Sequence, residues 1–404
     1  MTENRRFVRA GLVLNPVFDY LEDEDRYLSA RATPKYRFNI IGCGIIGQEH
    51  IRVTLMEGRA TIHGVYDPNP RSIISAQREA TKYDPNLKLV VYDSLEEACS
   101  DEAADALIIC TPNYTHVEVM PTACASGKHI LLEKPIATTV RDAHKIRQMA
   151  DNHSAVFQVG LQYRFKPQYT EALYELLTRK TVGAVKTISM SEHRMPFLDK
   201  VGQWNKFARY SGDTLVEKCC HYFDLMNRVA DARPKTVYAV GSQAVNFTDL
   251  ERDGARSDIL DNGMVIVTYE NGVTASFNLC MFAPMFYEEL VVCGDEGRLK
   301  ATEHEDFLPH NLPITQLEIT TLDDRPSRTT TPMYPSLIQH SGHQGATYVE
   351  HVEFVDQIEG KPSRAASAEE GFWSIVVGAA AQASIKAGRP VEVEAFLSGH
   401  NVAA

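Results

Sequence analysis

The stretch that decides the fold is Tyr36-Arg37-Phe38-Asn39-Ile40-Ile41-Gly42-Cys43-Gly44-Ile45-Ile46-Gly47. A short apolar run ends here in Gly-x-Gly-x-x-Gly, and a helical pattern follows from about Gln48 to Glu57. The first glycine permits a sharp turn, the second lets the backbone approach a pyrophosphate, and the third allows close helix–strand packing. The start of the helix offers N–H groups and a positive dipole end to phosphates. We therefore predict that a dinucleotide is bound by Gly42, Gly44, Ile45, Ile46 and Gly47.

A second apolar run, 61–66, ends at Asp67, where this fingerprint expects an acid that binds a ribose hydroxyl. The alternative interpretation is a helix N-cap or a strand-end turn, because Asp-Pro-Asn-Pro is rich in turn residues. Four features agree in their order along the chain, so we favour the dinucleotide. A carboxylate at position 67 would repel a 2′-phosphate, and NAD is therefore the expected cofactor. Nearby Arg71 keeps NADP open as an alternative.

Composition narrows the function further. The chain has 404 residues and a net charge of −12, which argues for two domains and against a nucleic-acid partner. No apolar run approaches the roughly 20 residues of a membrane span, and the N-terminus lacks the apolar core of a secretory signal. The eight cysteines lack metal-ligand spacing, so we expect reduced thiols, no metal and a cytoplasmic location.

Strand and helix patterns alternate from Arg37 onward. Strands are expected at 37–41, 61–66, 87–92, 106–110, 129–132 and 156–161, and helices at 47–57, 70–82, 94–100, 116–126 and 140–152. This alternation predicts a parallel sheet covered on both faces, with ligands bound beyond the carboxyl ends of its strands.

The pattern changes after about residue 165. A helix fits 167–179, and a strand fits 183–194. Strands are then expected at 235–245, 263–269, 273–281, 288–294, 297–302 and 315–321, and helices at 347–359 and 367–387. We therefore predict an α/β Rossmann domain followed by an α+β domain with a large, mostly antiparallel open-faced sheet. The expected division is an N-terminal extension at 1–35, a cofactor domain at 36–162 and a substrate and oligomerisation domain at 163–404.

Two segments follow the carboxyl ends of predicted strands: 111–116, with the sequence Thr-Pro-Asn-Tyr-Thr-His, and Glu133-Lys134-Pro135. Pro135 restricts the turn, so Lys134 would be held in place. A lysine in a crevice can lose its charge and serve as an acid or base. The alternative, a solvated lysine paired with Glu133, fits this position less well.

A single helix is expected over 213–228. It would place Glu217, His221 and Asp224 at i, i+4 and i+7, on one face. These side chains could line a cleft or form an ordinary solvated face, and the sequence alone favours neither interpretation.

Together, these motifs resemble the Gfo/Idh/MocA family, the glucose–fructose oxidoreductase and inositol dehydrogenase type. The resemblance spans about 36–395 and rests on five segments: Gly42–Gly47 followed by His50, 111–116, Glu133-Lys134-Pro135, 212–224, and the closing Gly-x-Pro-Val pattern at 387–391. It implies a Rossmann domain, an open-faced sheet, homodimers or homotetramers, and hydride transfer between a sugar, cyclitol or polyol and NAD(P).

The resemblance also implies roles for individual residues. Lys134, His221 and Glu217 correspond to the catalytic set, and Glu217 stands where the family usually has Asp. Cofactor contacts are implied for Asn113, His116, Glu133, Lys134 and Gln162, and we add Thr111 from the same strand end. The residue types themselves, apart from the resemblance, make Tyr163, Arg164, Trp204, Lys218 and His343 candidate substrate contacts. Packing or a surface loop is an equally good interpretation of these aromatic, arginine and histidine residues. Lys218 and Cys219 replace the family's usual apolar residue and glycine.

We hypothesise that His221 and Lys134 share the proton of a reacting hydroxyl while Glu217 orients or charges them. Transient oxidation of a sugar carbon could instead assist the elimination of a glycosidic substituent. A sensor that binds NAD(P) without turnover is a third alternative, which the presence of both Lys134 and His221 disfavours.

Overall fold

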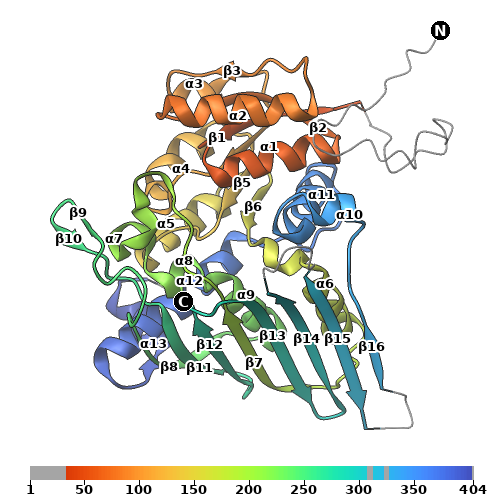
Figure 1. Cartoon of the computed structure of the whole chain (residues 1–404), viewed down its shortest axis with the longest axis vertical. Helices are drawn as coiled ribbons and strands as arrows, with labels where there is room; N and C mark the ends of the chain where they lie inside the picture. The colour runs from red at the N-terminus through yellow and green to blue at the C-terminus, as the bar shows by residue number, and fades with distance from the viewer. Residues whose placement is uncertain (1–32, 307–312, 323–326, 403–404) are drawn as a thin grey trace.

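The computed structural model describes residues 33–306, 313–322 and 327–402. Nearly all of the expected N-terminal extension, 1–35, lies outside these residues. The described chain contains two large sheets, with the first above the second in Figure 1. The fold class predicted from the sequence is confirmed.

The first sheet is parallel and has the strand order β3-β2-β1-β4-β5-β6. Its strands are β1 (Tyr36–Ile41), β2 (Ala60–Tyr66), β3 (Val90–Val91), β4 (Ala106–Ile109), β5 (His129–Glu133) and β6 (Phe157–Gly160). Its helices are α1 (Ile45–Glu57), α2 (Pro70–Tyr83), α3 (Leu95–Ser100), α4 (His116–Ala125) and α5 (Val140–Asp151). The central strands are fully buried because helices cover both faces, which explains their continuous apolar runs.

The second sheet has nine strands in the order β16-β15-β14-β13-β7-β12-β11-β8-β17. They are β7 (Val185–His193), β8 (Pro234–Ser242), β11 (Asn262–Tyr269), β12 (Thr274–Cys280), β13 (Phe286–Gly294), β14 (Gly297–Glu305), β15 (Ile314–Thr321), β16 (Arg328–Thr330) and β17 (Val391–Glu392). Its pairs are antiparallel apart from the parallel pair of β7 and β12. A small hairpin, β9 (Glu251–Arg252) and β10 (Ala255–Arg256), stands apart.

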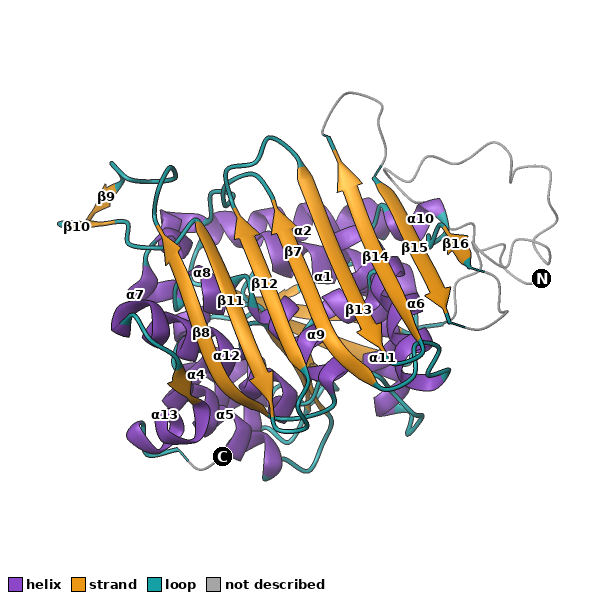
Figure 2. Cartoon of the chain, turned by 90° about the horizontal axis from the view of Figure 1, so that it is seen from below, coloured by secondary structure: helices purple, strands orange, loops and turns teal. Residues whose placement is uncertain are grey.

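Helices cover one face of the large sheet and leave the other open. Seen from below, the strands lie in front and the helices lie behind them (Figure 2). Those helices include α6 (Pro167–Leu173), α9 (Cys220–Ala230) and α12 (Ala368–Ala387). Along β8 and β11, residues alternate between buried and exposed, as expected for a sheet with one covered face.

Several C-terminal helices return to the first sheet. Helix α11 (Ala346–Ile358) packs against α1, and α12 packs against α5 as well as against the large sheet. The remaining helices are α7 (Ala208–Ser211), α8 (Thr214–Glu217), α10 (Ser336–Gln339) and α13 (Val393–Gly399). Helix α12 therefore contacts both the helices that cover the first sheet and the large sheet itself.

The prediction of a single helix over 213–228 is wrong. The structure has α8, a break at Lys218 and Cys219, and then α9. The N–H groups of both Lys218 and Cys219 donate to the carbonyl oxygen of Thr214, which forms a wider turn than an α-helix allows. As a result, Glu217 and His221 lie on different helices.

Candidate functional site

The glycine turn leaves room for a phosphate. Gly42 has a φ of 95°, and a Cβ atom there would lie 2.7 Å from the backbone of Cys110. A Cβ atom on Gly47 would lie 2.1 Å from the carbonyl oxygen of Gly42. By contrast, a Cβ atom on Gly44 would have no described atom within 4 Å. Gly44 is also the N-cap of α1 and caps it without a side chain, so the cradle fits a pyrophosphate.

Asp67 joins the end of β2 to this turn. One of its carboxylate oxygens accepts the N–H of Cys43 at 2.7 Å, and the other accepts the N–H of Asn69 at 2.7 Å. The N-cap of α2 is Asn69, so the helix-cap interpretation of Asp67 is wrong. Asp67 therefore stands beside the glycine turn, as a ribose-binding acid would.

The carboxyl ends of β4 and β5 carry the next candidates. His116 lies between the carbonyl oxygens of Thr111 and Pro135. Its Nε2 atom is 3.0 Å from the Thr111 oxygen, and its Nδ1 atom is 3.0 Å from the Pro135 oxygen. Burial lowers the pKa of His116, and the neutral ring carries a single N–H, which donates to one of these two carbonyl oxygens. Asn113 donates its amide to the carbonyl oxygen of Ser211 at 3.3 Å. The buried Oγ1 of Thr111 lacks a partner within the described chain, as does Oε1 of Gln162, so both could contact a cofactor.

Lys134 lies at the end of β5 and reaches toward the large sheet. Its ammonium donates to the carbonyl oxygen of Glu217 at 3.1 Å. Burial lowers the pKa of Lys134, but the charge of Glu217 opposes this effect, and the resulting pKa is above its ordinary value. Lys134 is therefore a cation at neutral pH.

The Glu217 carboxylate is buried beside several lysines. Oε1 lies 3.0 Å from the ammonium of Lys200, which also sits 4.6 Å from the ring centroid of Trp204. Burial alone would raise the pKa of Glu217, but Lys134 and Lys200 lower it to about 2. Glu217 is thus an anion that holds two lysines near the end of β5.

His221 is the neutral member of the site. Its ring stacks on Tyr163, with 3.9 Å between ring centroids and 12° between planes. Burial lowers the pKa of His221 well below its ordinary value, and the charges of Lys134 and Lys218 lower it further. The buried Nδ1 atom has no hydrogen-bond partner in the described chain. The ring is therefore uncharged at neutral pH, and its Nδ1 atom is not occupied by another group of the described chain.

Lys218 also contacts Tyr163. Its ammonium donates to the Tyr163 hydroxyl at 2.5 Å and forms an ion pair with Glu192 at 3.1 Å. The ammonium also lies 4.4 Å from the centroid of the Tyr163 ring. Lys218 thus contacts the same aromatic ring that supports His221, and it brings a second cation close to His221.

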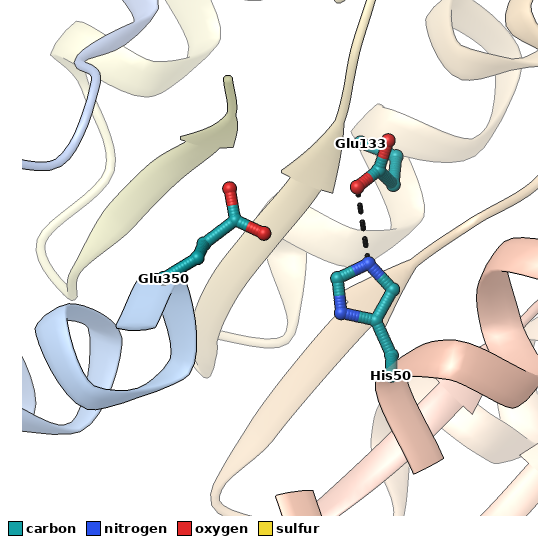
Figure 3. A group of neighbouring side chains, drawn as sticks. All are labelled: His50, Glu133 and Glu350. Atoms are coloured by element: carbon teal, nitrogen blue, oxygen red, sulfur yellow. Dashed lines mark hydrogen bonds and ion pairs between the residues drawn. The ribbon is translucent and has the colours of Figure 1, made fainter. Parts of the chain in front are cut away.

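Glu133 is held from behind by a buried histidine. His50 Nε2 lies 3.0 Å from Glu133 Oε1, and Glu350 on α11 points its carboxylate toward both (Figure 3). The ligand atoms of these three residues lie within 4.8 Å of one another, a spacing that suits a metal ion. A proton between His50 and Glu133 explains their direct hydrogen bond equally well, so we assign no metal here.

Two matches to family models show which protein family the chain belongs to. The model described as "Oxidoreductase family, NAD-binding Rossmann fold" matches residues 36–161. The model described as "Oxidoreductase family, C-terminal alpha/beta domain" matches residues 174–393. The chain belongs to the Gfo/Idh/MocA oxidoreductase family. It is an oxidoreductase with an NAD-binding domain, and the resemblance proposed from its motifs is confirmed.

Named relatives within the Gfo/Idh/MocA family act on different substrates. The chain is 23% identical to myo-inositol 2-dehydrogenase of Thermotoga maritima, over 89% of this chain and 98% of that protein. It is 25% identical to 2,7-anhydro-N-acetylneuraminate hydratase of Escherichia coli, over 50% of this chain and 52% of that protein. It resembles the structure of levoglucosan dehydrogenase in complex with NADH, with a TM-score of 0.73, 18% identity, and coverage of 89% and 99%.

The sequence-predicted substrate contacts of this Gfo/Idh/MocA protein differ in how they join the candidate site. Arg164 is fully buried and donates to both carboxylate oxygens of Asp224, at 2.6 and 2.5 Å, away from His221. His343 bonds Glu49 at 2.7 Å, and its ring lies 6.2 Å from that of Tyr163. Trp204 reaches the site only through its contact with Lys200.

Sequence reasoning missed Glu192, Arg194 and Lys200. Glu192 lies on β7 opposite Glu288 of β13, which lies opposite Glu303 of β14, and all three side chains are fully buried. The alternating pattern of β7 places Glu192 on the buried face, and a charged residue at such a position was the available signal.

No described helix is long and apolar enough to cross a membrane.

Proposed function

We propose that the protein oxidises a secondary hydroxyl of a sugar, cyclitol or related polyol and transfers the hydride to NAD. The observation that carries the proposal is the pairing of a neutral His221 with a cationic Lys134 at the carboxyl edge of the NAD-binding sheet. The names of the inositol and levoglucosan dehydrogenases support this substrate class.

The two side chains have complementary tasks. NAD, when bound, accepts the hydride at the nicotinamide C4. His221 takes the hydroxyl proton, since burial and nearby cations keep its ring neutral. Lys134 stabilises the negative charge that develops on the oxygen, and Glu217 holds the Lys134 ammonium in place. Lys134 is therefore an electrostatic and acid group in this proposal, and His221 is the base.

The residues around the glycine turn suit the cofactor. Gly44 and the N-terminus of α1 would hold the pyrophosphate, together with Gly42, Ile45, Ile46 and Gly47. Asp67 would bind the ribose. Thr111, Asn113, His116, Glu133 and Gln162 would form the nicotinamide side, where Thr111 and Gln162 keep unpartnered oxygens.

We assign the substrate pocket to Tyr163, Lys218, Trp204 and His343. Tyr163 and Lys218 contact or adjoin His221 directly, whereas Trp204 and His343 lie at its margin. We leave Arg164 out of the pocket because its guanidinium donates hydrogen bonds to Asp224 and also lies 2.8 Å from Glu370.

A substrate panel tests the proposal. Purified protein is incubated with NAD or NADP and with inositols, free sugars and glycosides, while reduced nicotinamide is followed by absorbance. We expect reduction of NAD by at least one polyol. Cleavage of a glycoside without net NADH would instead support transient oxidation followed by elimination, and one relative is named as a hydratase. The absence of both signals would contradict the proposal and would favour a cofactor-binding sensor.

We further propose a homo-oligomer that covers the open face of the large sheet. This face exposes Tyr238 and Val240 on β8 and Met264 and Ile266 on β11, which lie opposite one another in register. Contiguous apolar side chains on a sheet face are typical of an interface. Light scattering should give a mass of two or four chains, and Met264→Lys should lower it.

A further inference from the structure

Several charged side chains gather around Glu217, close to His221. Four cationic side chains interact with Glu217, namely Lys134, Lys200, Lys218 and Arg194. Glu217 itself and Glu192 are the two carboxylates that pair with them. Behind them, Lys166 lies 2.6 Å from Glu288 and 2.8 Å from Glu303. Glu133 also faces Lys134, and Glu305 faces Lys166, so cations and carboxylates alternate around this site.

Arg194 is the cation of this group that has N–H groups available for a further hydrogen bond. It follows β7 directly, and its Nε donates to the carbonyl oxygen of Met195 at 3.1 Å. Its Nη1 reaches Glu192 at 3.4 Å, while Nη2 has no partner in the part of the chain that the structure describes. The Arg194 side chain is 21% exposed, whereas that of Lys218 is 5% exposed. Arg194 therefore offers N–H groups to a molecule that enters from solvent.

Glu192 supplies an acceptor beside this donor. Its side chain is fully buried, and Oε1 serves both Lys218, at 3.1 Å, and Arg194. Its Oε2 atom is buried and has no hydrogen-bond partner in the described chain. A buried carboxylate oxygen without a donor is costly, and a hydroxyl group of a bound molecule would satisfy it. Donor and acceptor groups thus adjoin each other beside Tyr163, whose ring stacks on His221.

We propose that the site selects an anionic polyol, with Arg194 binding its carboxylate or phosphate group and Glu192 accepting one of its hydroxyls. This inference rests on the proposed dehydrogenase function and names its substrate class. A guanidinium presents paired N–H groups that match a carboxylate or phosphate, and such charge-assisted hydrogen bonds are about twice as strong as neutral ones. Lys218 pairs with Glu192 and holds its carboxylate in place, and Lys134 remains assigned to the reacting oxygen.

The test compares matched pairs of substrates that differ in one charged group. Glucose is paired with glucuronate, and myo-inositol with an inositol monophosphate, with NAD saturating. We expect at least one acid to exceed its neutral partner about tenfold or more in kcat/KM. The carboxylate and phosphate arms identify which anion is preferred. The advantage should shrink as salt increases, because salt screens a partly exposed charge pair.

The variant Arg194→Gln removes the charge and retains polar N–H groups. We expect about a 10- to 100-fold loss of kcat/KM for the preferred acid, mainly through KM, as for the loss of one charge-assisted interaction. The loss with the neutral partner should be smaller, so the variant should lower the ratio of kcat/KM for the acid to kcat/KM for its neutral partner. Arg389→Gln, at an exposed arginine in the turn after α12, is the control for net charge and should change neither rate.

The outcomes separate the two proposals. Oxidation of neutral polyols with no preference for acids would overturn the inference and leave the dehydrogenase function intact. Equal losses for both partners in Arg194→Gln would make Arg194 a purely structural residue and also overturn it. If wild type oxidises nothing, the dehydrogenase proposal fails; calorimetry with NAD-loaded protein then decides whether the acid binds through Arg194. Absence of that binding overturns the inference as well.

Discussion

The imidazole of His221 lies parallel to the phenol ring of Tyr163, 3.9 Å away between centroids. The Tyr163 hydroxyl in turn accepts a hydrogen bond from Lys218. One aromatic ring thus supports the proposed base on its face and a cation at its edge. Tyr163 comes from the segment after β6, whereas Lys218 lies in the break between α8 and α9 and His221 lies in the first turn of α9.

The stack gives a first prediction. Tyr163→Phe keeps the ring but removes the acceptor of Lys218, so oxidation of a neutral polyol should fall by less than about tenfold, as for the loss of one hydrogen bond. Tyr163→Leu removes the ring, and kcat should fall at least tenfold further because His221 loses its orientation. Steady-state kinetics on both variants measures this. Equal activity of the Phe and Leu variants would show that the stack has no role in turnover.

The pH dependence of kcat/KM forms a second prediction. Burial and neighbouring cations lower the pKa of His221, so the ring should stay neutral and active below pH 6.5, its ordinary pKa. The pKa of Lys134 is raised above 10.5, so the ammonium should persist across the neutral and mildly alkaline range. We expect a plateau that extends below pH 6.5. An acid limb centred at or above that value would contradict the assignment of His221 as a base held neutral.

The glycine turn offers a matched pair of substitutions. Gly44→Ala meets open space and has a φ of −67°, so the protein should fold normally but lose affinity for NAD at least tenfold where the methyl meets the pyrophosphate. Gly47→Ala places a methyl 2.1 Å from the carbonyl oxygen of Gly42, so it should lower the melting temperature as well. Calorimetric binding and thermal unfolding distinguish the two effects. Undiminished NAD affinity in Gly44→Ala would refute the cradle.

Glu350 makes stability depend on pH. Burial and the charges of Glu133 and Glu49 raise its pKa well above the ordinary 4.5 in the folded state. Its contribution to stability is therefore complete below pH 4.5 and is lost as pH rises through the folded pKa. The loss amounts to up to about 1.4 kcal/mol per pH unit.

Glu350→Gln mimics the neutral acid and removes this loss. Its free energy of unfolding, measured with denaturant, should gain on wild type as pH rises from about 5 to 8 across that window. The exposed Glu394→Gln on α13 should show no such trend. A constant difference between Glu350→Gln and wild type over this range would mean that Glu350 is ionised in the folded protein.

Much of this fold could be predicted because hydrophobic periodicity is local. The strands and helices of the first sheet begin and end within a few residues of their expected bounds, and Gly42–Gly47 lie at the strand–helix junction. The break at Lys218 could not be predicted, because it depends on two N–H groups that share one carbonyl oxygen. The short terminal strand β17 likewise forms only through pairing with β8.

The site was predictable by residue type but not by contact. Lys134 and Glu217 are 83 residues apart in sequence, and their hydrogen bond requires the two sheets to face each other. Arg164 illustrates the limit: its neighbour Tyr163 joins the site, whereas Arg164 turns the opposite way to reach Asp224. Glu192 and Arg194 escaped notice because the sequence does not show which strand face meets the active centre.

The central claim, that Lys134 and His221 together perform the oxidation, is tested most directly by single-turnover hydride transfer. The experiment uses wild type, Lys134→Ala and His221→Ala, each loaded with NAD and mixed with the best polyol from the panel. We predict that each variant loses about 10²- to 10⁴-fold in the rate of NADH formation, the usual contribution of acid–base groups. Formation of NADH near the wild-type rate in either variant would contradict the account.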